Sequence, residues 1–152
     1  MKAELLETIK TLSVAELKDL YRASIPTHLA PSAIFWDSYA DSEEKLAIGL
    51  RACLLMWLAS GEKIVPMEFQ LRVVIAVMSG QDALIDVGTG SGKTLCMIIP
   101  CLLDAPGIIS IIISPLKHLQ TVQVIDFERY GVRTVAINED TPNDPLLWKV
   151  PY

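Results

Sequence analysis

The chain has 152 residues, of which 51% are hydrophobic and 20% charged, enough apolar material for the core of one ordinary domain. The net charge of −5 gives no electrostatic argument for nucleic-acid binding, because a basic face is the usual footprint of such proteins. Three irregularly spaced cysteines without a Cys/His cluster disfavour a zinc site and indicate buried thiols in a reducing, intracellular compartment. The N-terminus does not resemble a signal peptide, and the apolar runs at 46–59 and 95–116 are too short or too interrupted to span a membrane.

Residues 1–62 are expected to form an α-helical N-terminal segment. Ser13 and Glu16 have the spacing of a capping box at a helix start. Residues 25–35 contain two prolines, which interrupt a helix, and are expected to form a loop. A strongly apolar helix follows within residues 41–60. We expect this helix to pack on the next domain, and a helical partner is the alternative.

Residues 63–152 are expected to alternate between strand and helix. The expected elements are a helix at 68–78, a strand at 83–87, a helix at 93–103, a strand at 108–113, a helix at 115–130 and a strand at 132–137. The tail beyond residue 137 holds several prolines and no expected element. The alternation predicts an α/β fold with a parallel sheet and right-handed crossovers.

A glycine-rich segment, VGTGSGKT at 87–94, lies between the first expected strand and the helix after it. Its glycines allow a tight bend that offers backbone N–H groups to phosphate oxygens, and the start of the next helix favours an anion. Lys93 is expected to reach the β- and γ-phosphates, and the Thr94 hydroxyl to ligate Mg²⁺. The strict motif has glycine in place of Val87, but the strand before and the helix after are the context it requires. The expected nucleotide-binding residues are Gly88, Thr89, Gly90, Ser91, Gly92, Lys93 and Thr94.

Residues 65–145 resemble the first RecA-like lobe of superfamily 2 helicases, most closely the RecQ-like DNA helicases. The resemblance is carried by MEFQLR at 67–72, by the glycine-rich loop with Leu95, Cys96 and Pro100 behind it, and by SPLKHLQTVQ at 114–123. It implies that Gln70 reads the edge of adenine, a task suited to an amide that both donates and accepts hydrogen bonds. The contacts that it implies with the DNA backbone are Ser114, Pro115, Leu116, Gln123 and, in the segment 137–142, Asn138.

By this resemblance the chain is the ATP-binding part of an ATP-dependent DNA helicase, with ATP, Mg²⁺ and DNA as ligands and a nuclear location; the intact family unwinds DNA in the 3′–5′ direction. Two positions depart from the family pattern. Met67 and Glu68 stand where an arginine usually precedes the glutamine, and Asp86 replaces an apolar residue. Simpler interpretations stay open: Gln70 as a helix-surface glutamine, and Ser114 as a plain helix cap.

Hydrolysis needs a carboxylate that holds Mg²⁺, a group that positions water and commonly an arginine from a second lobe. The family's DEAH-type run is not in the sequence, so no catalytic residue is assigned. We therefore expect a partial lobe, truncated before the DEAH motif, that binds ATP without hydrolysing it alone. Its sheet is expected to lack its middle strands, and exposed strand edges favour aggregation. The alternatives are a non-enzymatic nucleotide-binding or interaction fragment and an unrelated P-loop enzyme.

Overall fold

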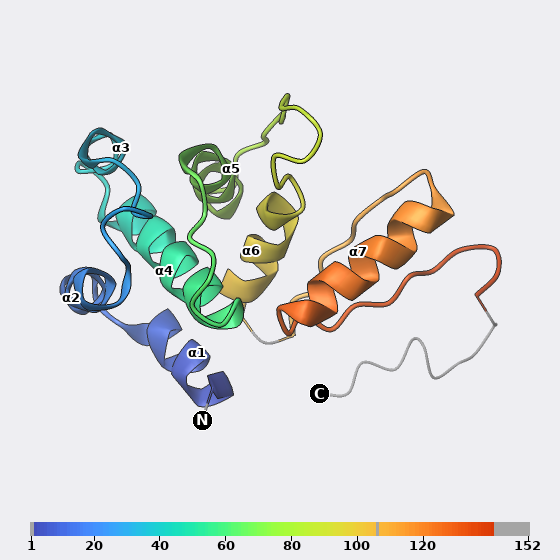
Figure 1. Ribbon diagram of the computed structural model, residues 1–152, viewed down its shortest axis with the longest axis horizontal. Coiled ribbons are helices and arrows are strands. Elements are labelled where there is room, and N and C mark those ends of the chain that lie inside the picture. The colour runs from blue at the N-terminus through green and yellow to red at the C-terminus, as the bar shows by residue number, and fades with distance from the viewer. Residues whose placement is uncertain (1, 106, 142–152) are drawn as a thin grey trace. The chain divides into compact units, whose positions relative to one another are not determined.

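The computed structural model describes residues 2–105 and 107–141 of a chain that divides into two compact units, one up to Leu103 and one from Asp104 onward. The helices of the first unit are α1 Lys2–Thr11, α2 Val14–Ser24, α3 Ala33–Asp37, α4 Glu43–Ala59, α5 Glu68–Met78 and α6 Leu95–Leu103 (Figure 1). The second unit contains α7 Lys117–Arg129. No helix in the described ranges is long and apolar enough to cross a membrane. Pro106 and the expected proline-rich tail from residue 142 lie outside the described residues.

Helix α4 forms the centre of the first unit because it is apolar on nearly all sides. The Ser42 hydroxyl caps its start by accepting a hydrogen bond from the Lys45 N–H at 3.3 Å, and Glu43 and Glu44 match the positive end of the helix dipole. Helices α1, α2, α5 and α6 pack against it (Figure 1). The apolar helix expected at 41–60 therefore fills the core of this chain, and a partner binding there would have to displace a neighbouring helix.

The capping box expected at Ser13 is confirmed at the start of α2. The Ser13 hydroxyl accepts a hydrogen bond from the Glu16 N–H at 3.4 Å, and the Glu16 carboxylate accepts one from the Ser13 N–H at 2.8 Å. These hydrogen bonds, the side-chain bond to Ser13 first, lower the pKa of Glu16. The box holds α2 in the orientation that buries Leu17 completely, in the same core as Ile9 of α1.

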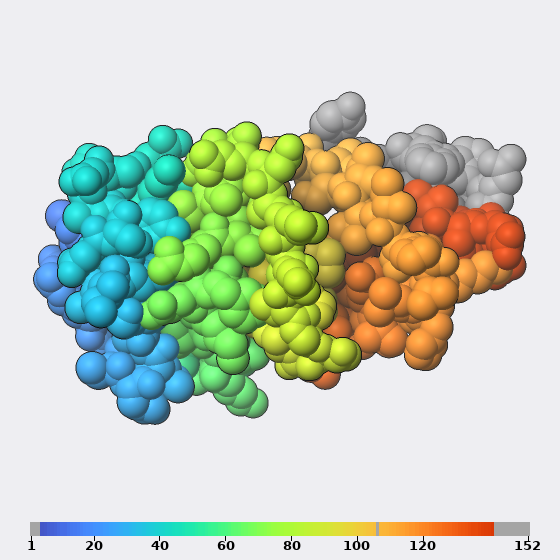
Figure 2. All heavy atoms as spheres, turned by 90° about the horizontal axis from the view of Figure 1, so that it is seen from above, coloured from blue at the N-terminus to red at the C-terminus, as the bar shows by residue number. Residues whose placement is uncertain are grey.

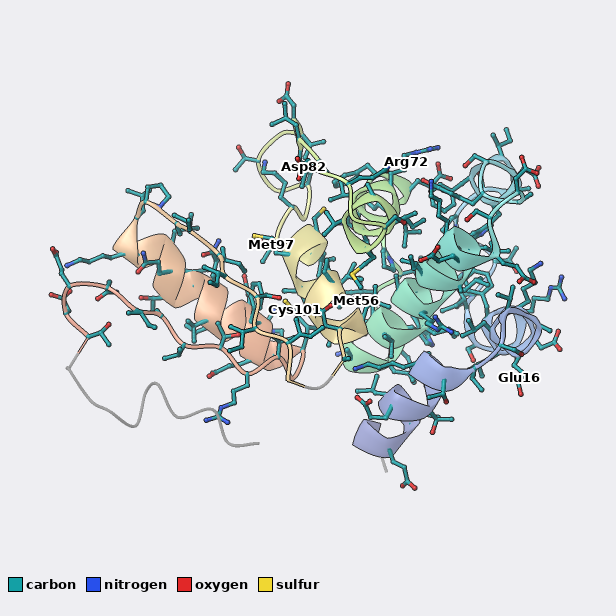
Figure 3. The ribbon with its side chains drawn as sticks, turned by 180° about the vertical axis from the view of Figure 1, so that it is seen from behind. Glu16, Met56, Arg72, Asp82, Met97 and Cys101 are labelled. Atoms are coloured by element: carbon teal, nitrogen blue, oxygen red, sulfur yellow. The ribbon has the colours of Figure 1, made fainter. Side chains whose placement is uncertain are left out.

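Helix α3 begins inside the region expected to be a loop, because Ser32 supplies a cap: its hydroxyl accepts a hydrogen bond from the Phe35 N–H at 3.2 Å. The helix is then joined to α5. The Ser32 N–H donates to the Glu68 carboxylate at 2.9 Å. The guanidinium of Arg72, whose side chain is labelled in Figure 3, lies 5.2 Å from the centre of the Phe35 ring. A Cβ on Gly49 would lie 2.9 Å from the Trp36 ring, so only glycine lets α4 approach α3 this closely.

The contact between Ser32 and Glu68 predicts a pH-dependent stability. The hydrogen bond from the Ser32 N–H is the main cause that lowers the pKa of Glu68 from its ordinary value of 4.5. A lowered folded-state pKa gives stabilisation that is present above the ordinary pKa and lost as the pH falls through the folded-state value. We expect urea unfolding to show a larger deficit of Glu68→Gln relative to the unmodified chain at pH 7 than at pH 3. The control Glu62→Gln removes the same charge from an exposed position. A deficit of Glu68→Gln that is equal at both pH values would contradict the prediction.

The expected parallel sheet is absent from the described residues, so the prediction of an α/β fold with a sheet is wrong. The segments 83–87, 108–113 and 132–137 are neither helix nor strand, and the last two run along opposite sides of α7 (Figure 1). Leu84 is 98% exposed, and Ile113 is 93% exposed. A β-branched run prefers an extended backbone, but hydrogen-bonded pairing and burial must come from neighbouring strands, which these segments lack.

The exposed isoleucines between residues 108 and 113 predict self-association. Ile111 is 84% exposed, and no charged residue lies between Ala105 and Leu116. Such an uncharged β-branched segment is an aggregation hazard. We expect Ile111→Lys to weaken self-association about 10- to 100-fold, the factor that burial of one large aliphatic side chain supplies. Sedimentation at several protein concentrations measures it, with Ile34→Lys, 80% exposed in the first unit, as a control of equal charge. Equal effects of the two lysines would show that net charge alone is responsible.

Candidate nucleotide-binding site

The glycine-rich loop lies between α5 and α6 on the surface of the first unit, where the segment around residues 80–92 is yellow-green in Figure 2. Gly90 has a φ of +82° and Gly92 a φ of +79°, in the left-handed region that favours glycine. The Ser91 hydroxyl donates to the Gly88 carbonyl at 2.6 Å and draws the loop together. The glycines therefore form the tight bend that a phosphate-binding loop needs.

Lys93 folds back across the loop instead of extending into solvent. Its ammonium donates to the carbonyl of Val87 at 2.7 Å and to that of Gly88 at 3.0 Å. Carbonyl oxygens carry only partial negative charge, so a phosphate oxygen would attract this ammonium more strongly. The positive charge is thus already positioned at the residues expected to surround a triphosphate.

The free backbone N–H groups of the loop fit an anion. From Gly88 through Thr94, the turn at Thr89 and Gly90 brings the Ser91 N–H toward the Gly88 carbonyl, and no other backbone N–H donates to a residue in the described part of the chain. Helix α6 begins at Leu95, two residues later than expected. Lys93 and Thr94 form a tight turn closed by a hydrogen bond from the Leu95 N–H to the Gly92 carbonyl at 3.0 Å, and the first hydrogen bond between residues four apart joins the Ile98 N–H to the Thr94 carbonyl. A run of unpaired N–H groups before a helix is the donor arrangement that phosphate oxygens require.

Gln70 on α5 reaches this loop. Its Nε2 donates to the Gly92 carbonyl at 3.0 Å, and its Oε1 accepts from the Met67 N–H at 2.8 Å. It is only 2% exposed, so the interpretation as a helix-surface glutamine is wrong. Two positions singled out separately in the sequence are thus in direct contact. Asp86 is exposed beside the loop, and Asp82 lies further up the segment that connects α5 to the loop (Figure 3).

The expected nucleic-acid contacts all lie in the second unit, where Gln120 connects two of them. Its Nε2 donates to the Ser114 carbonyl at 2.9 Å, and its Oε1 accepts from Asn138 Nδ2 at 3.1 Å. Ser114 is not the helix cap, because the residue before α7 is Leu116. The Ser114 hydroxyl is buried without a hydrogen-bond partner among the described residues. Pro115 and Leu116 are exposed and Gln123 is half-buried, and none of their side chains takes part in the hydrogen bonds of the Gln120 amide.

Lys117 joins the same two segments by charge. Its ammonium forms ion pairs with Glu139 and, at 2.7 Å, with Asp140. The hydrogen bond to Asp140, followed by that to Glu139, raises the pKa of Lys117. Sequence reasoning missed both Gln120 and this ion pair, because partners about 20 residues apart in the sequence leave no local pattern. No group of three His, Cys, Asp or Glu side chains in the described part of the chain could hold a metal ion.

Comparisons with known proteins identify relatives of this chain. Residues 67–145 match the family model described as DEAD/DEAH box helicase. A Caenorhabditis briggsae protein named as an ATP-dependent DNA helicase Q1 is 39% identical over 83 residues, which are 55% of this chain and 13% of that protein. The ATP-dependent DNA helicase RecQ of Haemophilus influenzae is 39% identical over 70 residues, 45% of this chain and 11% of the relative.

An ATP-dependent RNA helicase of Mycosarcoma maydis is 32% identical over 101 residues, which are 60% of this chain and 19% of that protein. The chain therefore spans less than a fifth of the length of each of these relatives. No solved structure matches the chain.

Proposed function

The chain belongs to the DEAD/DEAH box helicase family, whose model matches just over half of it, and from this premise we propose that it is the ATP-binding part of a RecQ-like DNA helicase. The observation that carries the proposal is the loop from Gly88 to Thr94, with unpaired backbone N–H groups and a lysine ammonium folded over it. Family membership excludes the alternative of an unrelated P-loop enzyme.

We assign the triphosphate to this loop. The N–H groups of residues 88–94 would donate to phosphate oxygens, and Lys93 would exchange its carbonyl partners for the β- and γ-phosphates. The Thr94 hydroxyl would ligate the Mg²⁺ that accompanies the nucleotide and neutralises part of its charge. Gln70 belongs to the same site through its hydrogen bond to Gly92. Hydrolysis is not assigned to these residues, because the sequence carries no DEAH-type carboxylate run.

We assign nucleic-acid contact to Ser114, Pro115, Leu116, Gln123 and Asn138 of the second unit. The Ser114 hydroxyl has no hydrogen-bond partner among the described residues, and because it is buried it could donate to a backbone phosphate only if the residues that cover it moved. The ammonium of Lys117 is already paired with Glu139 and Asp140, so its charge does not by itself attract a nucleic-acid strand to this unit. We propose DNA as the nucleic acid that is bound. The choice needs a test, because the relatives named above include both DNA and RNA helicases.

Calorimetric titration of the purified chain with ATP tests the proposal. We expect saturable binding in the presence of Mg²⁺ and weaker binding when Mg²⁺ is chelated, because Thr94 reaches the nucleotide through the metal. Fluorescence anisotropy with labelled single-stranded DNA, and with RNA of the same sequence, tests the second assignment. The absence of saturable ATP binding would refute the nucleotide site, and tighter binding of RNA than of DNA would refute the choice of strand.

A further inference from the structure

Among the described residues of the first unit, Gln70 is the buried polar side chain, and both ends of its amide are already hydrogen-bonded. Oε1 accepts from the Met67 N–H and Nε2 donates to the Gly92 carbonyl. These partners determine the orientation of the amide, because an N–H needs an acceptor and a carbonyl needs a donor. A base edge could use this amide only if the side chain left Gly92 or if its buried surroundings opened.

The contact with Gly92 depends on the backbone of the loop. A Cβ at position 92 would lie 2.7 Å from Gln70 Nε2, so the amide rests directly on the backbone. The Gly92 carbonyl also accepts the hydrogen bond from the Leu95 N–H that closes the turn directly before α6. One carbonyl therefore joins Gln70 to the bend of the loop and to the start of the helix, on either side of Lys93 and Thr94.

We propose that Gln70 is a positioning residue for the phosphate-binding loop, and that it strengthens phosphate binding whatever base the ligand carries. It fixes the Gly92 carbonyl, and thereby the left-handed bend and the N–H groups that face the phosphates. This inference rests on the proposed function and deepens it, since it transfers the effect of Gln70 from the base to the triphosphate. A ligand without a base should therefore also bind more weakly when Gln70 is replaced.

The test compares MgATP with inorganic triphosphate, which has no base, on the unmodified chain and on Gln70→Met. Methionine keeps the length of the side chain but removes both hydrogen bonds. We expect the affinity for both ligands to fall by the same factor, about 3- to 10-fold for the loss of a hydrogen bond. Gln81→Met changes an exposed glutamine of the same unit and should alter neither affinity. A loss for MgATP with an unchanged affinity for triphosphate would overturn the proposal in favour of adenine reading.

A second measurement does not depend on the folding of a variant. The side-chain amide resonance of Gln70 in the unmodified chain is followed by NMR during titration with each ligand. If Gln70 positions the loop, its amide resonance should shift in the same way with triphosphate as with MgATP, because the amide stays hydrogen-bonded to Gly92 in both complexes. A change with MgATP alone would overturn the proposal. Binding of neither ligand would refute the nucleotide site itself, whereas binding of both with no effect of Gln70→Met would refute only the role of Gln70.

Discussion

Replacing Lys93 with alanine is expected to weaken MgATP binding about 10- to 150-fold, the factor that corresponds to one hydrogen bond with a charged group. The ammonium already lies on the loop, where it donates to the carbonyls of Val87 and Gly88. In the complex those bonds would be replaced by stronger ones to phosphate oxygens, so the loss falls mainly on the bound state. Calorimetric titration of the chain with MgATP measures the effect.

Lys63→Ala is the matched control, because it removes the same charge from an exposed position of the same unit. It should leave the affinity within experimental error. Raising the salt concentration separates a local contact from general attraction, since exposed charges are screened more strongly. If Lys93→Ala and Lys63→Ala have the same effect on affinity, the lysine of the loop has no specific part in binding.

Phe35→Ala is expected to destabilise the first unit by about 3–5 kcal/mol, the usual cost of deleting a fully buried aromatic side chain. Phe35 is 0% exposed, and its ring lies edge-on to those of Trp36 at 5.0 Å and Tyr39 at 5.3 Å. It also lies beneath the guanidinium of Arg72, so its loss removes a contact between α3 and α5. Such a cost is a large share of the roughly 5–15 kcal/mol that stabilises ordinary domains.

Urea unfolding followed by circular dichroism measures this cost as a shift of the midpoint. The neighbouring Ile34 is 80% exposed, so Ile34→Ala is the matched control and should change stability by less than about 0.5 kcal/mol. Equal midpoints for the two variants would contradict the packing of α3 on α5. Excess MgATP should raise the midpoints of both the unmodified chain and Phe35→Ala, because a ligand that binds the folded state stabilises it.

Local signals in the sequence predicted most helices, although α3 begins inside a segment expected to be a loop. The capping box at Ser13 needs only two residues three apart, and α5 occupies the expected residues 68–78. Helix starts were less accurate where the cap was not local: α7 begins at Lys117, two residues after Pro115, and its cap residue Leu116 makes no side-chain hydrogen bond. A boundary depends on a few hydrogen bonds at its end, whereas the body of a helix depends on many residues.

The amino-acid sequence by itself determined the glycine-rich loop and the helicase family of this protein, because both depend on residue types at short spacings. Only the tertiary structure decided that Gln70 is buried against Gly92, that Gln120 joins Ser114 to Asn138, and that the apolar face of α4 is covered within the chain. It also decided against the sheet, since an extended segment becomes a strand only when another segment pairs with it. The pattern of apolar residues indicates which secondary structure a segment prefers, whereas the segments that would have to pair with it lie elsewhere in the sequence.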